Sequence, residues 1–383
     1  MKEVADIKIV IAPDSFKGSI SAFEASLAIE KGIKRSFPAA ETITVPLADG
    51  GEGTMDTLMT ATNGVKTAVT VTGPLGNPVE AFYGILGDRK TCVIEMASAS
   101  GLNLVPEQEQ NPLVTTTYGT GELIRHALDK GFRSFILALG GSGTNDGGAG
   151  MLQALGMNIL DNKRQRIGFG GGELSRVDKI SLENFDPRIN ESDFIIASDV
   201  ENPLVGRNGA SFVFGPQKGA TEDIAQILDQ SLTHWADKVE EMTSVKLHNM
   251  PGAGAAGGIG GAFQAFFPSV TEKGAEVVMN YTKLRERLAD ADLLITGEGQ
   301  VDFQTAFGKT PMRAALAAKN MGIPTIIIAG SVGKDIESLY RYGVVSVHSI
   351  MTRPMALDEA MRSASKLLEH TSEQVCRTYF MKL

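Results

Sequence analysis

The sequence has few of the residues and segments that mark several protein classes. It contains two cysteines, Cys92 and Cys376, and five histidines that lack the spacing of a metal site. Neither a disulfide framework nor a zinc site is therefore expected. No apolar run approaches the ~20 residues that a membrane-spanning helix needs. Charged residues come early in the N-terminal segment, so we expect no signal peptide and predict a cytoplasmic protein with no membrane partner.

Acidic residues outnumber basic ones, 45 to 36. The net charge is −9 and no basic block is present, which argues against a nucleic-acid partner. Hydrophobic residues make up 43% of the 383 residues, enough for the cores of two domains. Glycine is abundant, with 43 residues against a usual share of about 7%. The excess lies in loops, which predicts many close backbone approaches.

Both ends of the chain predict a parallel α/β sheet. An apolar strand at Ile7–Ala12 precedes a helix that opens at Ser21 with capping-box spacing. A second strand, Ile43–Ala48, precedes a helix through Leu58. The same alternation returns near residue 290, where we predict strands at 292–296, 325–329 and 344–347 and a helix at about 310–321.

The middle of the chain follows another pattern. Residues 65–94 contain short strands with a turn at Pro74–Pro78 and no room for helices, which predicts antiparallel structure. We therefore predict an α/β fold in which residues 66–287, with a mixed sheet, are inserted into a parallel-sheet domain made of residues 1–65 plus 288–383.

A glycine-rich turn, Gly140–Gly148, joins a predicted strand at 135–139 to a predicted helix. Backbone N–H groups at a helix N-terminus attract anions, and glycine lets a phosphate approach closely. This predicts a phosphate site made by Gly140, Gly141, Ser142, Thr144, Asn145 and Asp146. A tight structural turn with Asp146 as the N-cap is the alternative.

Four predicted strands end in an acid followed by a polar or glycine-rich turn. These acids are Asp14, Asp49, Asp199 and Glu298. In open α/β sheets, ligands bind at the carboxyl ends of the strands, so the acids are candidate site residues. Together with a phosphate site they suggest ATP and Mg²⁺, which prefers carboxylate and phosphate oxygens. Phosphoryl transfer to an alcohol also needs a base and cations.

Two further motifs lack their expected context. Gly308-Lys309-Thr310 resembles the end of a P-loop, but Phe303 stands where the leading glycine should be. Residues 252–257 match a dinucleotide fingerprint in form, but no convincing strand precedes them. A dinucleotide site there is therefore not favoured.

The motifs together resemble one family over essentially the whole chain. They are Lys8–Gly18, Leu47–Thr54, Gly140–Gly148, Ser198–Leu204, Phe214–Ala220, Pro251–Gly258 and Thr296–Gly299. In this order they are similar to the bacterial class I glycerate kinases. The resemblance implies ATP-dependent phosphorylation of D-glycerate, with 2-phosphoglycerate as the favoured product. It also implies a Rossmann-like domain that carries the inserted domain, with the active site in the cleft between them.

On this basis we assign roles to the candidate residues. Asp199 is the predicted base, and Lys17 and Lys309 balance charge. Asp49 and Glu52 are predicted to hold Mg²⁺. Predicted glycerate contacts are Asp14, Ser15, Asn202 and Glu298.

Several alternatives stay open. They are transfer to the 3-hydroxyl or to a related hydroxy acid, a non-catalytic hydroxy-acid sensor, and an NADP-linked oxidoreductase. The expected partners are small molecules, and a homodimer is left open.

Overall fold

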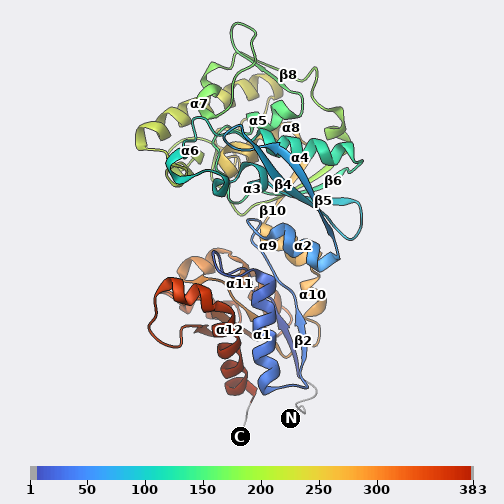
Figure 1. Cartoon of the computed structure of the whole chain (residues 1–383), viewed down its shortest axis with the longest axis vertical. Coiled ribbons are helices and arrows are strands. Elements are labelled where there is room, and N and C mark those ends of the chain that lie inside the picture. The colour runs from blue at the N-terminus through green and yellow to red at the C-terminus, as the bar shows by residue number, and fades with distance from the viewer. Residues whose placement is uncertain (1–6, 381–383) are drawn as a thin grey trace. The chain divides into compact units, whose positions relative to one another are not determined.

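The computed structural model describes residues 7–380 and contains two compact units (Figure 1). Unit 1 comprises residues 7–49, Asp56–Ala61 and residues 275–380, and unit 2 comprises Gly50–Met55 and Thr62–Gly274. Each unit has its own sheet and its own hydrophobic core. The division into functional domains at residues 66 and 287 stays a prediction.

Unit 1 is built on a five-stranded parallel sheet with the order β15-β13-β11-β1-β2. The strands are β1 (Lys8–Ile11), β2 (Glu41–Thr44), β11 (Leu293–Thr296), β13 (Thr325–Ala329) and β15 (Val344–Ser349). Numbered within the unit, this is the doubly wound order 2-1-3-4-5. The order reverses between β1 and β11, so the carboxyl ends of these two strands form the topological switch point.

Helices cover both faces of this sheet. Helices α1 (Ala22–Ser36) and α12 (Leu357–Phe380) pack on one face, where Ile326 and Ile328 of β13 join their core. On the other face, Ile327 and Ala329 pack with α11 (Thr310–Lys319). The predicted capping box of α1 is confirmed, since Ser21 and Glu24 cap each other. Shorter elements complete the unit: α2 (Thr54–Thr62), α9 (Gly274–Tyr281), α10 (Leu284–Arg287), β12 (Gln300–Val301) and β14 (Ser331–Val332).

Unit 2 contains a mixed six-stranded sheet with the order β10-β9-β6-β5-β4-β3. The strands are β3 (Val65–Thr72), β4 (Pro78–Ile85), β5 (Thr91–Glu95), β6 (Ser134–Ala138), β9 (Asp193–Ala197) and β10 (Ser269–Glu272). Strands β3, β4 and β5 pair antiparallel, and the remaining neighbours pair parallel. The predicted antiparallel segment and the mixed sheet are therefore confirmed, as is the parallel sheet of unit 1.

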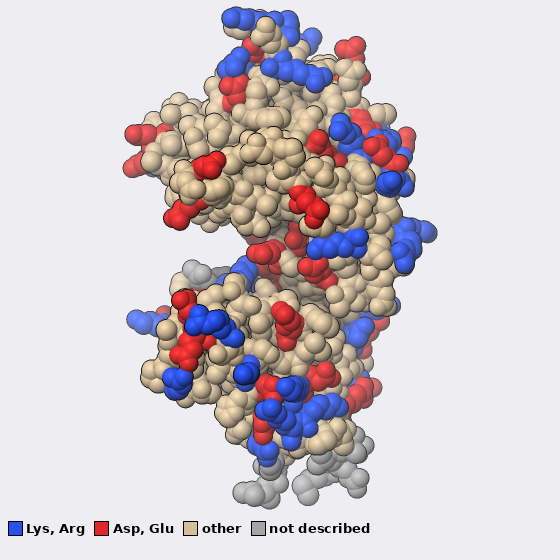
Figure 2. All heavy atoms as spheres, viewed as in Figure 1, with Lys and Arg blue, Asp and Glu red and all other residues tan. Residues whose placement is uncertain are grey.

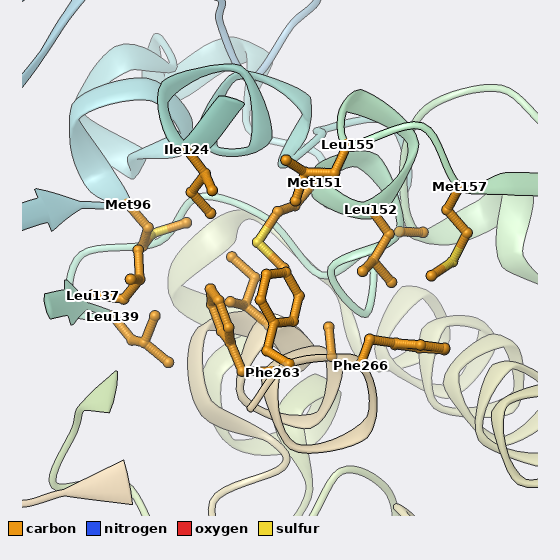
Figure 3. Packing of buried hydrophobic residues seen from close by; sticks show 14 of the residues in the cluster. Met96, Ile124, Leu137, Leu139, Met151, Leu152, Leu155, Met157, Phe263 and Phe266 are labelled. Carbon is orange, nitrogen blue, oxygen red and sulfur yellow. The ribbon is translucent and has the colours of Figure 1, made fainter. Parts of the chain in front are cut away.

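The core of unit 2 is large and continuous. Figure 3 shows Met151, Leu152 and Phe263 among its buried residues. The rings of Phe135 and Phe194 stack with their centroids 4.8 Å apart. The helices are α3 (Ala97–Ser100), α4 (Tyr118–Asp129), α5 (Ala149–Ala154), α6 (Ala210–Phe214), α7 (Glu222–Thr243) and α8 (Ile259–Phe266), beside a hairpin of β7 (Asn158–Leu160) and β8 (Lys179–Ser181).

One local detail differs from the sequence predictions and another agrees with them. The strand predicted at Ile43–Ala48 is β2, which spans Glu41–Thr44, because Pro46 has no N–H to donate to a ladder. The segment from 244 to 254, which precedes the dinucleotide-like motif, contains no strand and lies within the described chain. The motif therefore lacks the strand–turn–helix context of a true dinucleotide site.

The surface carries charges of both signs. Figure 2 shows acidic and basic side chains interspersed on the face in view. Within residues 7–380, no helix combines the length and the apolar character needed to cross a bilayer.

Candidate active site

A pocket of about 650 Å³ lies in unit 1 at the carboxyl ends of the parallel strands. Asp14 follows β1 and Glu298 follows β11, so both acids stand at the switch point of the sheet, where ligands of doubly wound folds bind. The predicted residues that line the pocket are Asp14, Ser15, Lys17, Asp49, Glu298 and Lys309. The structure thus brings together six candidates that the sequence scatters over nearly 300 positions.

Asp14 is held by two hydrogen bonds and is 6% exposed. The backbone N–H of Ser15 donates to Asp14 Oδ1 at 2.6 Å, and Thr310 Oγ1 donates to Asp14 Oδ2 at 2.7 Å. Burial and the nearby negative charge of Asp49 raise the pKa of Asp14 to about 6, although the two hydrogen bonds oppose that shift. A carboxylate with this pKa is mostly ionised at neutral pH and can still accept a proton.

Glu298 lies in a similar environment. Its Oε1 accepts a hydrogen bond from Thr305 Oγ1 at 3.1 Å and lies 3.8 Å from Lys309 Nζ. Burial raises the pKa of Glu298 to about 7; Lys309 opposes this shift and the charge of Asp14 adds to it. At neutral pH this group therefore exchanges a proton readily.

Two lysines supply positive charge to the pocket. Lys17 Nζ donates to Asp49 Oδ2 at 3.2 Å, and this carboxylate is the largest cause of the raised pKa of Lys17. The side chains of Lys17 and Lys309 are 70% and 40% exposed, so both ammonium groups are accessible to a ligand. The pocket thus combines acids that can take a proton with cations that can bind anionic oxygens.

The raised pKa of Glu298 predicts a pH-dependent cost to stability. Its folded-state pKa of about 7 exceeds the ordinary value of 4.5, so the folded protein loses stability as pH rises from about 4.5 to about 7. Glu298→Gln removes this loss and is expected to raise the free energy of unfolding by about 1–3 kcal/mol at pH 8, with no gain at pH 4. Urea titrations at both pH values measure this difference.

The matched control for this prediction is Glu337→Gln, an exposed acid of unit 1. The free energy of unfolding of Glu337→Gln should differ from that of the unmodified protein by less than about 0.5 kcal/mol at either pH. Equal stability of Glu298→Gln and the unmodified protein at pH 8 would contradict the cost assigned to this carboxylate.

The glycine-rich turn of unit 2 is mostly buried. Thr144, Asn145 and Asp146 are at most 1% exposed. Asp146 accepts hydrogen bonds from the N–H groups of Gly148 and Gly150 and from the N–H and hydroxyl of Thr117, and burial raises its pKa. With these hydrogen bonds Asp146 holds the turn in its conformation. It is not the N-cap of α5, however, because that position is occupied by Gly148.

The remaining surface of this turn lies at Gly140 and Gly141, of which Gly141 is exposed and has a φ of +77°. Asn145 Nδ2 donates to Ser211 Oγ at 3.0 Å, while Asn145 Oδ1 and Thr144 Oγ1 have no partner within the described chain. Contact between this turn and a phosphate stays a prediction, and the backbone at Gly140–Gly141 is its most accessible part.

Lys218, in the Phe214–Ala220 motif, is buried, although lysine side chains are mostly exposed in proteins. It is 1% exposed and donates from Nζ to Ser142 Oγ at 2.7 Å and to Thr144 O at 2.6 Å. Burial lowers its pKa to about 7. The motif around Lys218 therefore holds the glycine-rich turn in place, and no sequence pattern around it indicates this burial.

The other predicted residues lie in unit 2, outside the pocket of unit 1. Asp199 and Glu52 are exposed. Asn202 Nδ2 donates to Asn208 O at 2.9 Å and so supports its own loop. Their predicted roles as base, metal ligand and glycerate contact stay predictions.

Sequence reasoning missed two components of the pocket. Thr310 is the hydrogen-bond donor to Asp14, although the Gly308-Lys309-Thr310 motif was a visible signal for it. The apolar lining after β15 and in the first turns of α12 was missed as well. Its residues are Ile350, Met351, Met355, Leu357 and Met361. Their sequence is typical of an ordinary amphipathic helix start and gives no functional signal.

Comparisons with known proteins agree with this architecture. The sequence model described as the Glycerate kinase family matches residues 9–380. A glycerate kinase of Halalkalibacterium halodurans is 49% identical over 96% of this chain and 97% of its own. A glycerate 2-kinase of Escherichia coli is 48% identical over 97% of this chain and 98% of its own. A crystal structure of a protein assigned as glycerate kinase 2 from Salmonella typhimurium superposes with a TM-score of 0.86 at 46% identity, covering 97% of this chain and 98% of that one.

Proposed function

The chain belongs to the glycerate kinase family, and on that premise we propose that it transfers the γ-phosphoryl group of ATP to the 2-hydroxyl of D-glycerate. The products are 2-phospho-D-glycerate and ADP. The choice of the 2-hydroxyl is supported by the E. coli relative, which is named a glycerate 2-kinase. The observation that carries the proposal is the pocket of unit 1, with its acids and lysines at the switch point of a parallel sheet.

The transfer needs a base that takes the proton of the attacking hydroxyl. In the proposed reaction the hydroxyl oxygen bonds to the γ-phosphorus while the bond to the bridging oxygen breaks and ADP leaves. Asp14 suits this role because it lines the pocket and its pKa lies near the working pH. Asp199, which the sequence predicts as the base, is the alternative, and paired variants can distinguish the two.

Lys17 and Lys309 are the proposed cationic contacts. Glycerate carries a carboxylate and the phosphoryl group in transfer is anionic, so accessible ammonium groups stabilise both. Glu298 is proposed to contact glycerate beside Lys309, as the lining of the pocket allows. Ser15 contributes a hydroxyl to the same lining.

Magnesium is the expected companion of ATP. No group of three or more His, Cys, Asp or Glu side chains within residues 7–380 is arranged to hold a metal ion. Mg²⁺ in kinases is often bound by one or two carboxylates together with phosphates, so Asp49 in the pocket fits this mode. When bound, the ion neutralises phosphate charge. Glu52 lies in unit 2, outside this pocket, and its role as a ligand stays a sequence prediction.

A direct assay tests the proposed function. The purified chain is incubated with ATP, Mg²⁺ and D-glycerate, ADP is measured by a coupled reaction, and the product is identified by ³¹P NMR. We expect ADP and 2-phosphoglycerate in equal amounts. Absence of ADP above background rejects the kinase proposal, which leaves the hydroxy-acid sensor and the oxidoreductase. Formation of 3-phosphoglycerate supports the 3-hydroxyl alternative.

The role of Asp14 predicts a pH profile. A base must be deprotonated to act, so kcat/KM for glycerate should fall as pH drops through about 6. The Thr310 hydroxyl stabilises the charged form of Asp14, and Thr310→Val removes it without changing the side-chain shape much. This variant should therefore move the midpoint of the profile to higher pH.

Thr325→Val is the matched control for the pH profile. Thr325 is buried in β13 of the same sheet, and its hydroxyl has no hydrogen-bond partner within residues 7–380. Its profile should coincide with that of the unmodified protein. An unchanged midpoint in Thr310→Val would argue against Asp14 as the titrating group.

We propose that the two units act as separate domains, a division supported by their independent sheets and cores. The proposed partners are the small molecules glycerate and ATP. A cytoplasmic location and a homodimer stay predictions, which cell fractionation and sedimentation can test.

A further inference from the structure

The pocket of unit 1 has an apolar side that the proposed chemistry of glycerate does not use. Five of its lining residues form this side, which we term the methionine wall: Ile350, Met351, Met355, Leu357 and Met361. Ile350 to Met355 belong to the loop after β15, and Leu357 and Met361 to the first turns of α12. The hydroxyl of Ser19 donates to the Met361 carbonyl at 2.6 Å. This bond ties the wall to the loop that carries Asp14 and Lys17.

The volume of the pocket exceeds what glycerate needs. Glycerate has seven non-hydrogen atoms and occupies at most about 200 Å³ if each takes the ~30 Å³ of a liquid water molecule. More than half of the 650 Å³ is therefore left for another ligand. Glycerate is also polar at every carbon, so it has no apolar surface to place against the wall.

The wall exposes apolar surface that needs a partner. Leu357 is 73% exposed, the largest value among the exposed large hydrophobic residues of the described chain. Apolar side chains gathered at a pocket mark a binding surface more often than isolated exposed ones do. Methionine side chains are flexible and polarisable and make favourable sulfur contacts with aromatic rings. A flat aromatic group is therefore the ligand that this surface fits.

We propose that the methionine wall binds the purine base of the nucleotide. The proposal rests on the proposed function, since it assigns a place to one part of ATP. The base has about ten non-hydrogen atoms and needs about 300 Å³ on the same scale, which the remaining volume accommodates; whole ATP, with about 31 such atoms, needs about 900 Å³ and must therefore extend out of the pocket. The phosphates then extend toward Lys17 and Lys309, the exposed cations of the same pocket.

Equilibrium binding tests this assignment without any turnover. Calorimetry measures the Kd of ADP, inorganic tripolyphosphate and glycerate for the unmodified chain and for the double variant Met351→Ala/Met355→Ala. We expect the Kd of ADP to rise at least tenfold, which equals about 1.4 kcal/mol. The Kd of tripolyphosphate and glycerate should change less than twofold, because neither ligand carries a base.

Two further variants keep the test decisive. Met321→Ala removes a 43% exposed methionine of unit 1 that does not line the pocket, and all three affinities should stay unchanged. Leu357→Gln changes an exposed position that tolerates a polar side chain, and should weaken ADP at least threefold even where the double variant fails to fold. The conservative variant Met355→Leu should retain ADP affinity within about threefold.

The outcomes separate this inference from the proposed function. Unchanged ADP affinity in both the double variant and Leu357→Gln overturns the assignment of the base to the wall. Equal losses for ADP, tripolyphosphate and glycerate also overturn it, because the wall then supports the whole pocket. Wall-dependent ADP binding without phosphorylation of glycerate would reject the proposed function alone.

Discussion

Asp14→Asn is expected to lower kcat for glycerate phosphorylation by about 10²–10⁴-fold, the usual cost of losing a general base. The amide has nearly the same shape as the carboxylate, and its oxygen can still accept the hydrogen bond from the N–H of Ser15. The Thr310 hydroxyl can reverse its role and accept from the amide. Folding should therefore survive while proton acceptance is lost. Steady-state kinetics at pH 7.5, with circular dichroism as a check on folding, measure the effect.

Asp199→Asn is the partner experiment. With Asp14 as the base, this variant should keep kcat within about tenfold of the unmodified chain. A folded Asp199→Asn enzyme that loses 10²–10⁴-fold, beside a nearly normal Asp14→Asn enzyme, would instead establish the base that the sequence predicts. If both variants lose much of their activity, the dependence of kcat/KM on pH decides between them. Only replacement of the base should shift the acid limb of that profile.

Gly297→Ala is expected to destabilise unit 1 by about 3 kcal/mol or more and to abolish most of the activity. Gly297 lies between β11 and Glu298, and a Cβ atom at this position would stand 1.8 Å from the carbonyl oxygen of Ile328 in β13. The obstacle is backbone in a paired strand, which no side-chain rotation can relieve. The strand end that carries Glu298 must therefore shift. Urea denaturation and kcat/KM for glycerate report the two consequences.

Gly299→Ala is the control for stability. A Cβ atom there meets its nearest neighbour, the backbone N of Lys17, at an ordinary distance of 3.5 Å. Its free energy of unfolding should change by less than about 1 kcal/mol. If Gly297→Ala were as stable as Gly299→Ala, the close approach between Gly297 and β13 would not constrain this strand end.

The sequence predicted those features that depend on local pattern. Apolar runs identified β1, β6, β9, β11 and β13, and the spacing of Ser21 and Glu24 identified the start of α1. The acids became candidates because each follows a predicted strand. A parallel sheet places the carboxyl ends of its strands at one edge, where ligands bind. Recognition of the motif order then gave the family, which the comparisons confirm.

Features that depend on long-range order could not be predicted. The neighbour relation of β1 and β11 decides that Asp14 and Glu298 share a pocket, and nothing local to either strand encodes it. Burial of Lys218 depends on how its loop packs on the glycine-rich turn, and the residues around it in sequence do not indicate that packing. The methionine wall is formed by a loop and a helix start whose apolar residues give no functional signal in the sequence.

Because β1 pairs with β11, β1 is synthesised long before its partner strand. The N–H of Lys8 bonds Asp292 across 284 residues of sequence, and Ile9 pairs with Leu293. Ribosomes add about 5–20 residues per second, so β1 waits roughly 15–60 s before its partner strand emerges. The residues of unit 2 from 62 to 274 are complete before then. During that interval the edge of β1 that later pairs with β11 is open to other strands, which is an aggregation hazard.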